Sequence, residues 1–131
     1  MNKGTFTVST NRRMEFIDVT LLLEKAIGGQ SGDAALCCVY NPHTTAGLTI
    51  NEGADPAVQD DILSVLNTIV PHKYPYKHME GNSPAHIMAS LMGSSVTVFL
   101  ENGRLQLGTW QRIFFCEFDG PRTRKVFWRL L

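Results

Sequence analysis

The chain has 131 residues, of which 44% are hydrophobic and 18% charged, and its 12 basic and 12 acidic side chains give a formal net charge of zero. This length fits a single domain over residues 1–131 with a core of its own. The proportion of hydrophobic to charged residues excludes a disordered or fibrous protein. A nucleic-acid binder normally carries a basic excess, so we expect no nucleic-acid partner.

The three cysteines, Cys37, Cys38 and Cys116, form no CxxC pair, and no signal-peptide pattern opens the sequence. No apolar run approaches the ~20 residues that a membrane-spanning helix needs. These observations predict a cytoplasmic protein without membrane contact. The cysteines are expected to be small apolar side chains, and none is a candidate nucleophile.

The first half of the chain alternates between strand and helix patterns. Residues 3–9 and 13–18 alternate as strands do, and residues 19–27 carry apolar side chains at helical spacing before a glycine pair. Strands are expected next at 34–40 and 46–51. The first of these is buried, and the second ends in polar residues.

The clearest helix follows, with Asp55 as its N-cap and Pro56 at its first position. Pro71 stops it. Its predicted apolar stripe is Val58, Ile62, Val65, Leu66 and Ile69.

A shorter third helix is expected from Ser83 to about Gly93, with His86 in its first turn and with Ile87 and Leu91 facing inward. The remaining predicted elements are three strands joined by the turns Asn102-Gly103 and Gly120-Pro121. These strands are expected at 95–100, 104–118 and 122–130.

Two parts of these last strands indicate a ligand site. If the final strand extends from Arg122, then Arg122 and Arg124 continue an apolar row, which is the profile of a pocket mouth. Gly108 stands just before Trp110 and Gln111, and a strand glycine often marks a bulge or a close approach by a ligand. The alternatives are structural salt bridges for the arginines and a core position for the tryptophan.

The segment from Tyr76 to His86 concentrates His78, Glu80 and His86 within eleven residues. Together with His43, these histidines could form an open zinc-type site, although their spacing is not a metal signature and a lone histidine is more often structural. Glu52 and Glu80 lie near predicted element ends, where a general base could act.

Phosphate is the ligand that the basic groups favour. The helix start at Ser83 offers unpaired backbone N–H groups, and Arg122 and Arg124 offer paired donors suited to a phosphate.

Several segments together carry a resemblance to a known family. They are His43-Thr44-Thr45-Ala46-Gly47-Leu48-Thr49-Ile50-Asn51-Glu52, Asp55-Pro56 with Val58 and Asp61, Tyr76-x-His78-x-Glu80-Gly81-Asn82 through Ala85-His86-Ile87, Leu107-Gly108-Thr109-Trp110-Gln111, and Asp119-Gly120-Pro121-Arg122-x-Arg124. In this order they resemble the successive signatures of the YjbQ-type family over nearly the full length.

This resemblance implies a single, compact α+β domain with a β-sandwich-like antiparallel core and about three helices, assembled as a homotrimer. It further implies secondary thiamine-phosphate synthase activity, which couples hydroxymethylpyrimidine diphosphate to a thiazole phosphate and releases pyrophosphate. The alternatives are a non-catalytic trimer that binds a phosphorylated metabolite and a metal-dependent phosphatase or hydrolase.

With the resemblance, the candidate residues form three groups. The catalytic candidates are His43, Glu52, His78, Glu80 and His86, and the phosphate-binding candidates are Ser83, Trp110, Gln111, Arg122 and Arg124. The metal-ligand candidates are His43, His78 and His86, for a divalent ion such as zinc or magnesium.

Overall fold

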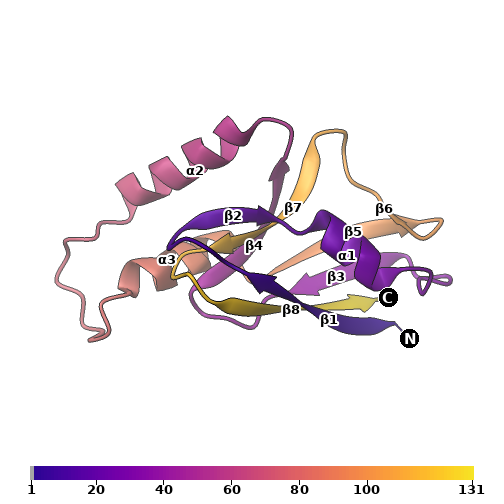
Figure 1. The fold of residues 1–131 in the computed structure, drawn as a ribbon, viewed down its shortest axis with the longest axis horizontal. Coiled ribbons are helices and arrows are strands. Elements are labelled where there is room, and N and C mark those ends of the chain that lie inside the picture. The colour runs from indigo at the N-terminus through magenta and orange to yellow at the C-terminus, as the bar shows by residue number, and fades with distance from the viewer. Residues whose placement is uncertain (1) are drawn as a thin grey trace.

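A computed structural model describes residues 2–131. In chain order the elements are β1 (Lys3–Ser9), β2 (Glu15–Asp18), α1 (Thr20–Ile27), β3 (Leu36–Tyr40), β4 (Ala46–Glu52), α2 (Pro56–Ile69), α3 (Ser83–Met92), β5 (Ser95–Glu101), β6 (Arg104–Leu105), β7 (Gln111–Glu117) and β8 (Thr123–Leu130) (Figure 1). The predicted helices and most predicted strands are therefore present.

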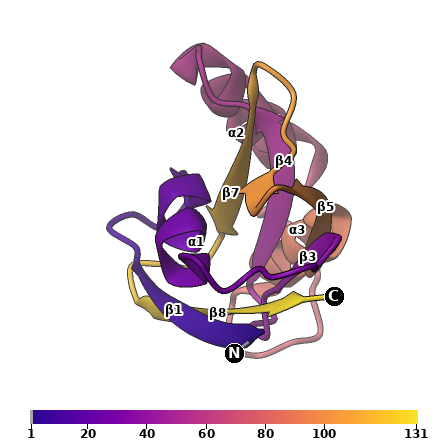
Figure 2. The same ribbon diagram turned by 90° about the vertical axis from the view of Figure 1, so that its right-hand side faces the viewer.

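The strands form two antiparallel sheets. The larger sheet has the order β1-β8-β3-β5-β6, and the smaller one has the order β2-β7-β4. Figure 2 shows β4 and β7 rising steeply from the layer that contains β1 and β8. The fold is α+β, as predicted.

The core has two parts, and β7 contributes to both. Because side chains alternate along a strand, Ile113 and Phe115 face the cluster that also includes α1, while Phe114 and Cys116 face the cluster under α2 and α3. Both faces of this strand are therefore covered. Its last residue, Glu117, is also fully buried.

The prediction of one continuous strand over 104–118 is wrong, because residues 106–110 separate β6 from β7. A turn interrupts it, in which the Gln111 amide donates to the Gly108 carbonyl at 3.0 Å and the Gly108 amide donates to Gln111 Oε1 at 2.9 Å. This turn carries the chain from the larger sheet to the smaller one. The final strand likewise begins at Thr123, so Arg122 lies in the turn before it.

The predicted inner face of α3 is also wrong. Ala85, Met88 and Ala89 are buried, whereas Ile87 and Leu91 are exposed. The helix lies close against β4 because Gly47 has no side chain, and a Cβ there would lie 2.7 Å from the Met92 Cβ. This close approach favours the small-residue face of the helix.

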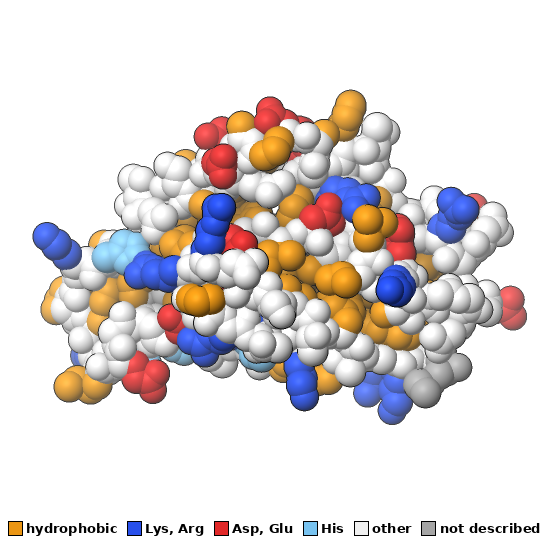
Figure 3. All heavy atoms as spheres, viewed as in Figure 1, with side chains coloured by type: hydrophobic (Ala, Val, Ile, Leu, Met, Phe, Trp, Pro, Cys, Tyr) orange, Lys and Arg blue, Asp and Glu red, His pale blue; other side chains and the backbone are white. Residues whose placement is uncertain are grey.

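Helix α2 begins as predicted. Asp55 Oδ1 accepts a hydrogen bond from the Ala57 amide at 3.0 Å, and Pro56 is the first helical residue. Of its predicted stripe only Leu66 is buried, because one side alone of the helix covers the core. Acidic side chains gather on the outer surface of this region (Figure 3). Within residues 2–131, no helix is long and apolar enough to cross a membrane.

Candidate functional site

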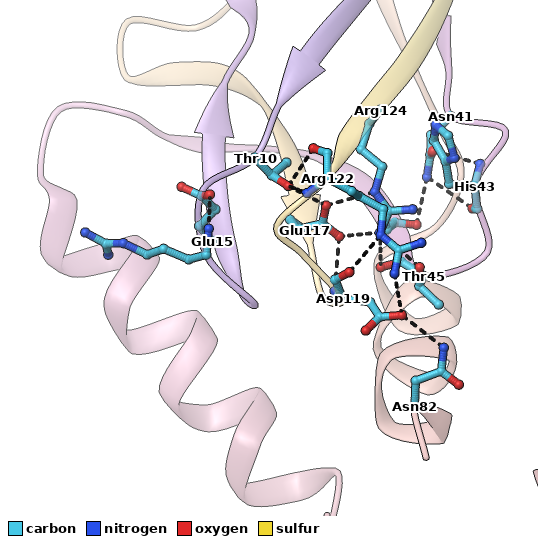
Figure 4. Close-up of polar contacts among 12 residues, drawn as sticks. Thr10, Glu15, Asn41, His43, Thr45, Asn82, Glu117, Asp119, Arg122 and Arg124 are labelled. Atoms are coloured by element: carbon cyan, nitrogen blue, oxygen red, sulfur yellow. Dashed lines mark hydrogen bonds and ion pairs between the residues drawn. The ribbon is translucent and has the colours of Figure 1, made fainter. Parts of the chain in front are cut away.

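A hollow of about 600 Å³ opens where three loops meet. The loops are the one between β3 and β4, the one that leads into α3, and the turn between β7 and β8 (Figure 4). It is lined by Pro42, His43, Thr44, Thr45, His78, Glu80, Asn82, His86, Asp119, Arg122 and Arg124.

The floor of this pocket is a buried ion pair between Arg124 and Glu117. The two side chains are 2% and 0% exposed. Arg124 Nε donates to Glu117 Oε1 at 2.8 Å, its NH2 group donates to Glu117 Oε2, and the same NH2 group donates to Thr45 Oγ1 at 2.9 Å. A bidentate pair of this kind fixes both side chains. The Nε and NH2 groups of Arg124 thus already donate to protein side chains.

Thr10, which follows the last residue of β1, adds a further hydrogen bond to the buried Glu117 carboxylate. Its hydroxyl donates to Glu117 Oε1 at 2.8 Å and accepts from the Arg122 amide at 2.9 Å. Burial alone would raise the pKa of Glu117, but the hydrogen bonds from Arg124, the Asp119 amide and Thr10 outweigh it and hold that pKa below its usual range. Glu117 is therefore ionised at neutral pH.

His43 is held in one tautomer. The Lys125 amide donates to His43 Nε2 at 2.9 Å, so the neutral ring carries its proton on Nδ1. Asn41 fixes the loop, because its Oδ1 accepts from the His43 amide at 2.9 Å and its Nδ2 donates to the Ala46 carbonyl at 2.7 Å. Burial and the nearby Arg124 charge lower the pKa of His43, which keeps the ring neutral.

His78 and His86 line the same pocket from the loop before α3 and from its first turn. Their rings meet edge to face with centroids 5.3 Å apart, and His78 Nε2 is 3.9 Å from Glu80 Oε2. His86 comes from the first turn of α3, as predicted. Both rings line the pocket and could exchange protons with a bound molecule.

Asp119 and Arg122 form the third wall. Arg122 Nε donates to the Asp119 carbonyl at 2.9 Å, and its NH2 group donates to Asp119 Oδ2 at 3.0 Å. Unlike Arg124, the Arg122 side chain is 50% exposed. Its NH1 group makes no hydrogen bond to a described residue, so Arg122 can bind an anion while its Nε and NH2 groups stay on Asp119.

The pocket brings together some of the predicted site residues and not others. His43, His78, Glu80, His86, Arg122 and Arg124 line it, whereas Ser83 follows the lining residue Asn82. Glu52, Trp110 and Gln111 lie at the far end of the smaller sheet, because β4 and β7 are antiparallel and pair Glu52 with Gln111 but Ala46 with Glu117. The pocket therefore contains part of the candidate set, and the roles of Glu52, Trp110 and Gln111 stay predictions.

The three histidines do not fit a shared metal ion in this arrangement. While Nε2 of His43 accepts the Lys125 hydrogen bond and Nδ1 holds the proton, the ring has no free lone pair for a metal. No group of three or more His, Cys, Asp or Glu side chains among residues 2–131 is arranged to hold a metal ion.

Sequence reasoning missed the residues that organise the pocket, chiefly Thr10, Asn82 and Glu117. Glu117 carries a usable signal, because it is the one charged residue in the apolar run 113–118. A charge inside such a run predicts a buried partner. Thr10 and Asn82 carry no comparable signal.

Comparisons with known proteins agree with one another. The family model described as UPF0047 protein YjbQ-like matches residues 4–131. A UPF0047 protein of Bacillus subtilis is 45% identical over 128 residues, covering 97% of each chain. One of Methanocaldococcus jannaschii is 44% identical over 126 residues, covering 96% of this chain and 91% of the relative.

Solved structures resemble this fold equally closely. An uncharacterised conserved protein of the same family from Clostridium acetobutylicum has a TM-score of 0.93 and 52% identity, with 98% of this chain and 99% of that chain covered. A hypothetical protein of Aeropyrum pernix has a TM-score of 0.92 and 41% identity, with 100% and 98% covered.

Proposed function

Because this chain belongs to the UPF0047 protein YjbQ-like family, we propose from its pocket that it is an enzyme acting on a small phosphorylated metabolite. The reaction to test first is the coupling of hydroxymethylpyrimidine diphosphate to a thiazole phosphate with release of pyrophosphate. The observation that supports it is a single hollow that combines His78 and His86 with the half-exposed Arg122.

In this proposal Arg122 and the start of α3 bind the diphosphate. Arg122 places positive charge beside the hollow. In the first turn of α3 the Ser83 amide is the donor left for a ligand, because Pro84 has no N–H and the Ala85 and His86 amides donate to the Asn82 carbonyl. A departing pyrophosphate needs such groups to stabilise its growing negative charge. The carbon–oxygen bond to the diphosphate breaks as a carbon–nitrogen bond to the thiazole forms. His78 or His86 in its protonated form donates a proton to the leaving group.

Arg124 has a different role from the one that its sequence position indicates. Its guanidinium is already neutralised by Glu117, so we assign it to the wall of the pocket and not to the phosphate. Metal chemistry is not part of the proposed steps, since the histidines do not fit a common ion. An ion held by His78 and His86 alone stays a separate prediction.

The test is a turnover assay with purified protein and the two thiamine precursors. His78→Ala and His86→Ala should each lower the rate of thiamine phosphate formation by at least about 100-fold, the scale expected of a general acid. His72→Ala is the matched control, because His72 is exposed and its ring hydrogen-bonds to Arg13 and Asn67, which do not line this pocket. Unchanged turnover in both pocket variants, or none in the unaltered chain, would contradict the proposal.

A non-catalytic module that binds a phosphorylated metabolite is the alternative. It has the same pocket and predicts that pyrophosphate raises the melting temperature without any turnover. The stabilisation should then grow with the logarithm of ligand concentration above the dissociation constant. Arg122→Ala should remove this effect, because Arg122 is the exposed pocket cation.

A homotrimer is also part of the proposal. The outer face of the larger sheet carries Tyr40, Phe99 and Phe127 with exposures of 52%, 68% and 40%, and it forms a hollow of about 870 Å³. Outer faces of antiparallel sheets are usually polar, so this face supports contact with further copies of the chain.

We also propose that the protein is located in the cytoplasm. Cys37, Cys38 and Cys116 are all free thiols. Free thiols persist in reducing compartments, which supports this location.

A further inference from the structure

Asn82 occupies the N-cap position of α3 but does not cap the helix. Asparagine is among the best N-cap residues, and a cap typically stabilises a helix by about 1 kcal/mol. Here the side chain makes no hydrogen bond to the first turn. Asn82 hydrogen-bonds to the first turn through its backbone carbonyl, which accepts from the Ala85 amide at 3.0 Å.

The Asn82 side chain is also left partly unsatisfied. Its Oδ1 is buried and has no hydrogen-bond partner within residues 2–131. A buried acceptor without a partner is costly, and such groups in a folded protein call for an explanation. Local stability at α3 therefore does not account for this side-chain conformation.

The conformation is explained by Asp119. Asn82 Nδ2 donates to Asp119 Oδ2 at 2.9 Å across 37 positions of sequence, and Arg122 donates to the same oxygen at 3.0 Å (Figure 4). The Asp119 amide donates to Glu117 Oε2 at 3.0 Å. The carboxylate is thus held from two sides through Oδ2, while Oδ1 has no hydrogen bond to any described residue.

We propose that Asn82 is a positioning residue that holds Asp119 in the pocket, so that Asp119 Oδ1 accepts a hydrogen bond from an N–H or O–H group of the substrate. This assignment rests on the proposed function. It narrows the substrate class to molecules that carry such a donor close to a phosphate, because Arg122 stands beside Asp119. An amino group on a heterocycle satisfies this requirement.

Asn82→Asp is the test substitution. It keeps the shape of the side chain but sets a carboxylate against Asp119, while a negative charge at the start of α3 favours the helix. We expect the melting temperature to stay within a few degrees, kcat to fall about 100-fold because the acceptor is misplaced, and KM to rise because the substrate loses a hydrogen bond and the new carboxylate repels its phosphate. Asn51→Asp is the control, because Asn51 is exposed near the far end of β4.

A second readout does not depend on turnover. The Gly120 amide donates to the Arg13 carbonyl at 3.0 Å and the Arg122 amide donates to Thr10 Oγ1 at 2.9 Å, so both should exchange slowly with solvent. In Asn82→Asp these amides should exchange about tenfold faster, because the turn has lost its tie to α3. In Asn51→Asp they should not change.

The two readouts separate the possible failures. Unchanged exchange in Asn82→Asp overturns the positioning role. Faster exchange in Asn82→Asp with normal kcat overturns the substrate contact of Asp119. If the unaltered chain forms no thiamine phosphate, the proposed function fails, and the exchange rates alone decide whether Asn82 positions Asp119.

Discussion

His43 Nε2 accepts a hydrogen bond from the backbone amide of Lys125, with 2.9 Å between the two nitrogens. Strand β3 ends at Tyr40, so among the described residues no strand pairs with β8 on that side beyond Phe127, the partner of Tyr40. The His43 imidazole accepts the hydrogen bond that a neighbouring strand would otherwise accept from the Lys125 amide. This single contact fixes the tautomer of His43 and ties the β3–β4 loop to β8.

This contact predicts a pH dependence of stability. An unfolded histidine has a pKa of about 6.5, and burial together with Arg124 lowers the pKa of His43 in the folded chain. Below about pH 6.5 the unfolded state therefore binds a proton that the folded state does not, and stability falls as the pH drops toward the folded pKa. His43→Gln keeps an acceptor for Lys125 but does not titrate.

Urea unfolding at pH 8 and pH 5.5 measures this effect. The unaltered chain should lose more free energy of unfolding between the two values than His43→Gln does, while the two should differ by about 1 kcal/mol or less at pH 8. The other histidines are common to both proteins and cancel. An equal loss in both would show that His43 keeps its ordinary pKa.

The same contact predicts which histidines a metal ion would use. With Nε2 engaged and the proton on Nδ1, His43 contributes nothing to zinc affinity. Competition with a zinc-binding dye should therefore give His43→Ala the affinity of the unaltered chain, whereas His86→Ala lowers it if His78 and His86 bind zinc. An equal fall in both variants would mean that His43 leaves Lys125 and ligates the ion.

The sequence predicted the pocket's histidines but not their relation to one another. Local patterns locate elements, so the helix start that carries His86 and the Asp55 cap of α2 were predictable. The separation of Glu52 from the pocket depends on the register of β4 and β7, which no local pattern contains. Register is set by long-range pairing of side chains on buried faces.

Arg122 and Arg124 also show that local sequence patterns do not predict long-range contacts. Both were predicted on one strand face, and the sequence gives them the same charge and nearly the same position. The structure separates them, because Arg124 is fully buried in its pair with Glu117, whereas Arg122 pairs with Asp119 but stays half-exposed. Only the three-dimensional neighbours decide which arginine can bind a ligand.

The buried pair predicts a non-additive effect on stability. Glu117→Leu leaves the Arg124 charge buried without a counter-ion, Arg124→Met does the same to the Glu117 charge, and breaking such a pair costs about 3–5 kcal/mol. The double variant Glu117→Leu with Arg124→Met removes both charges and should recover most of that loss. Unfolding free energies of the single and double variants measure the coupling, and strictly additive losses would contradict it.

The pair should also make the chain sensitive to acid. The pKa of Glu117 is lowered in the folded state, so its contribution is present above the unfolded value of about 4.3 and is lost as the pH falls through the folded pKa. The double variant should therefore lose less stability than the unaltered chain below pH 4. An identical acid transition in both proteins would remove Glu117 as a cause.

The outer face of the larger sheet makes the last prediction, which concerns assembly. Phe127 and Tyr40 are cross-strand partners on this face, and Phe127→Glu would place a charge at the centre of any contact made there. Size-exclusion chromatography with light scattering should give three times the 14.6 kDa subunit mass for the unaltered chain and one subunit mass for the variant. Leu21→Glu is the matched control, because Leu21 is equally apolar and is exposed on α1. A trimer that survives Phe127→Glu but dissociates in Leu21→Glu would move the interface to α1, and a monomeric unaltered chain would remove the assembly altogether.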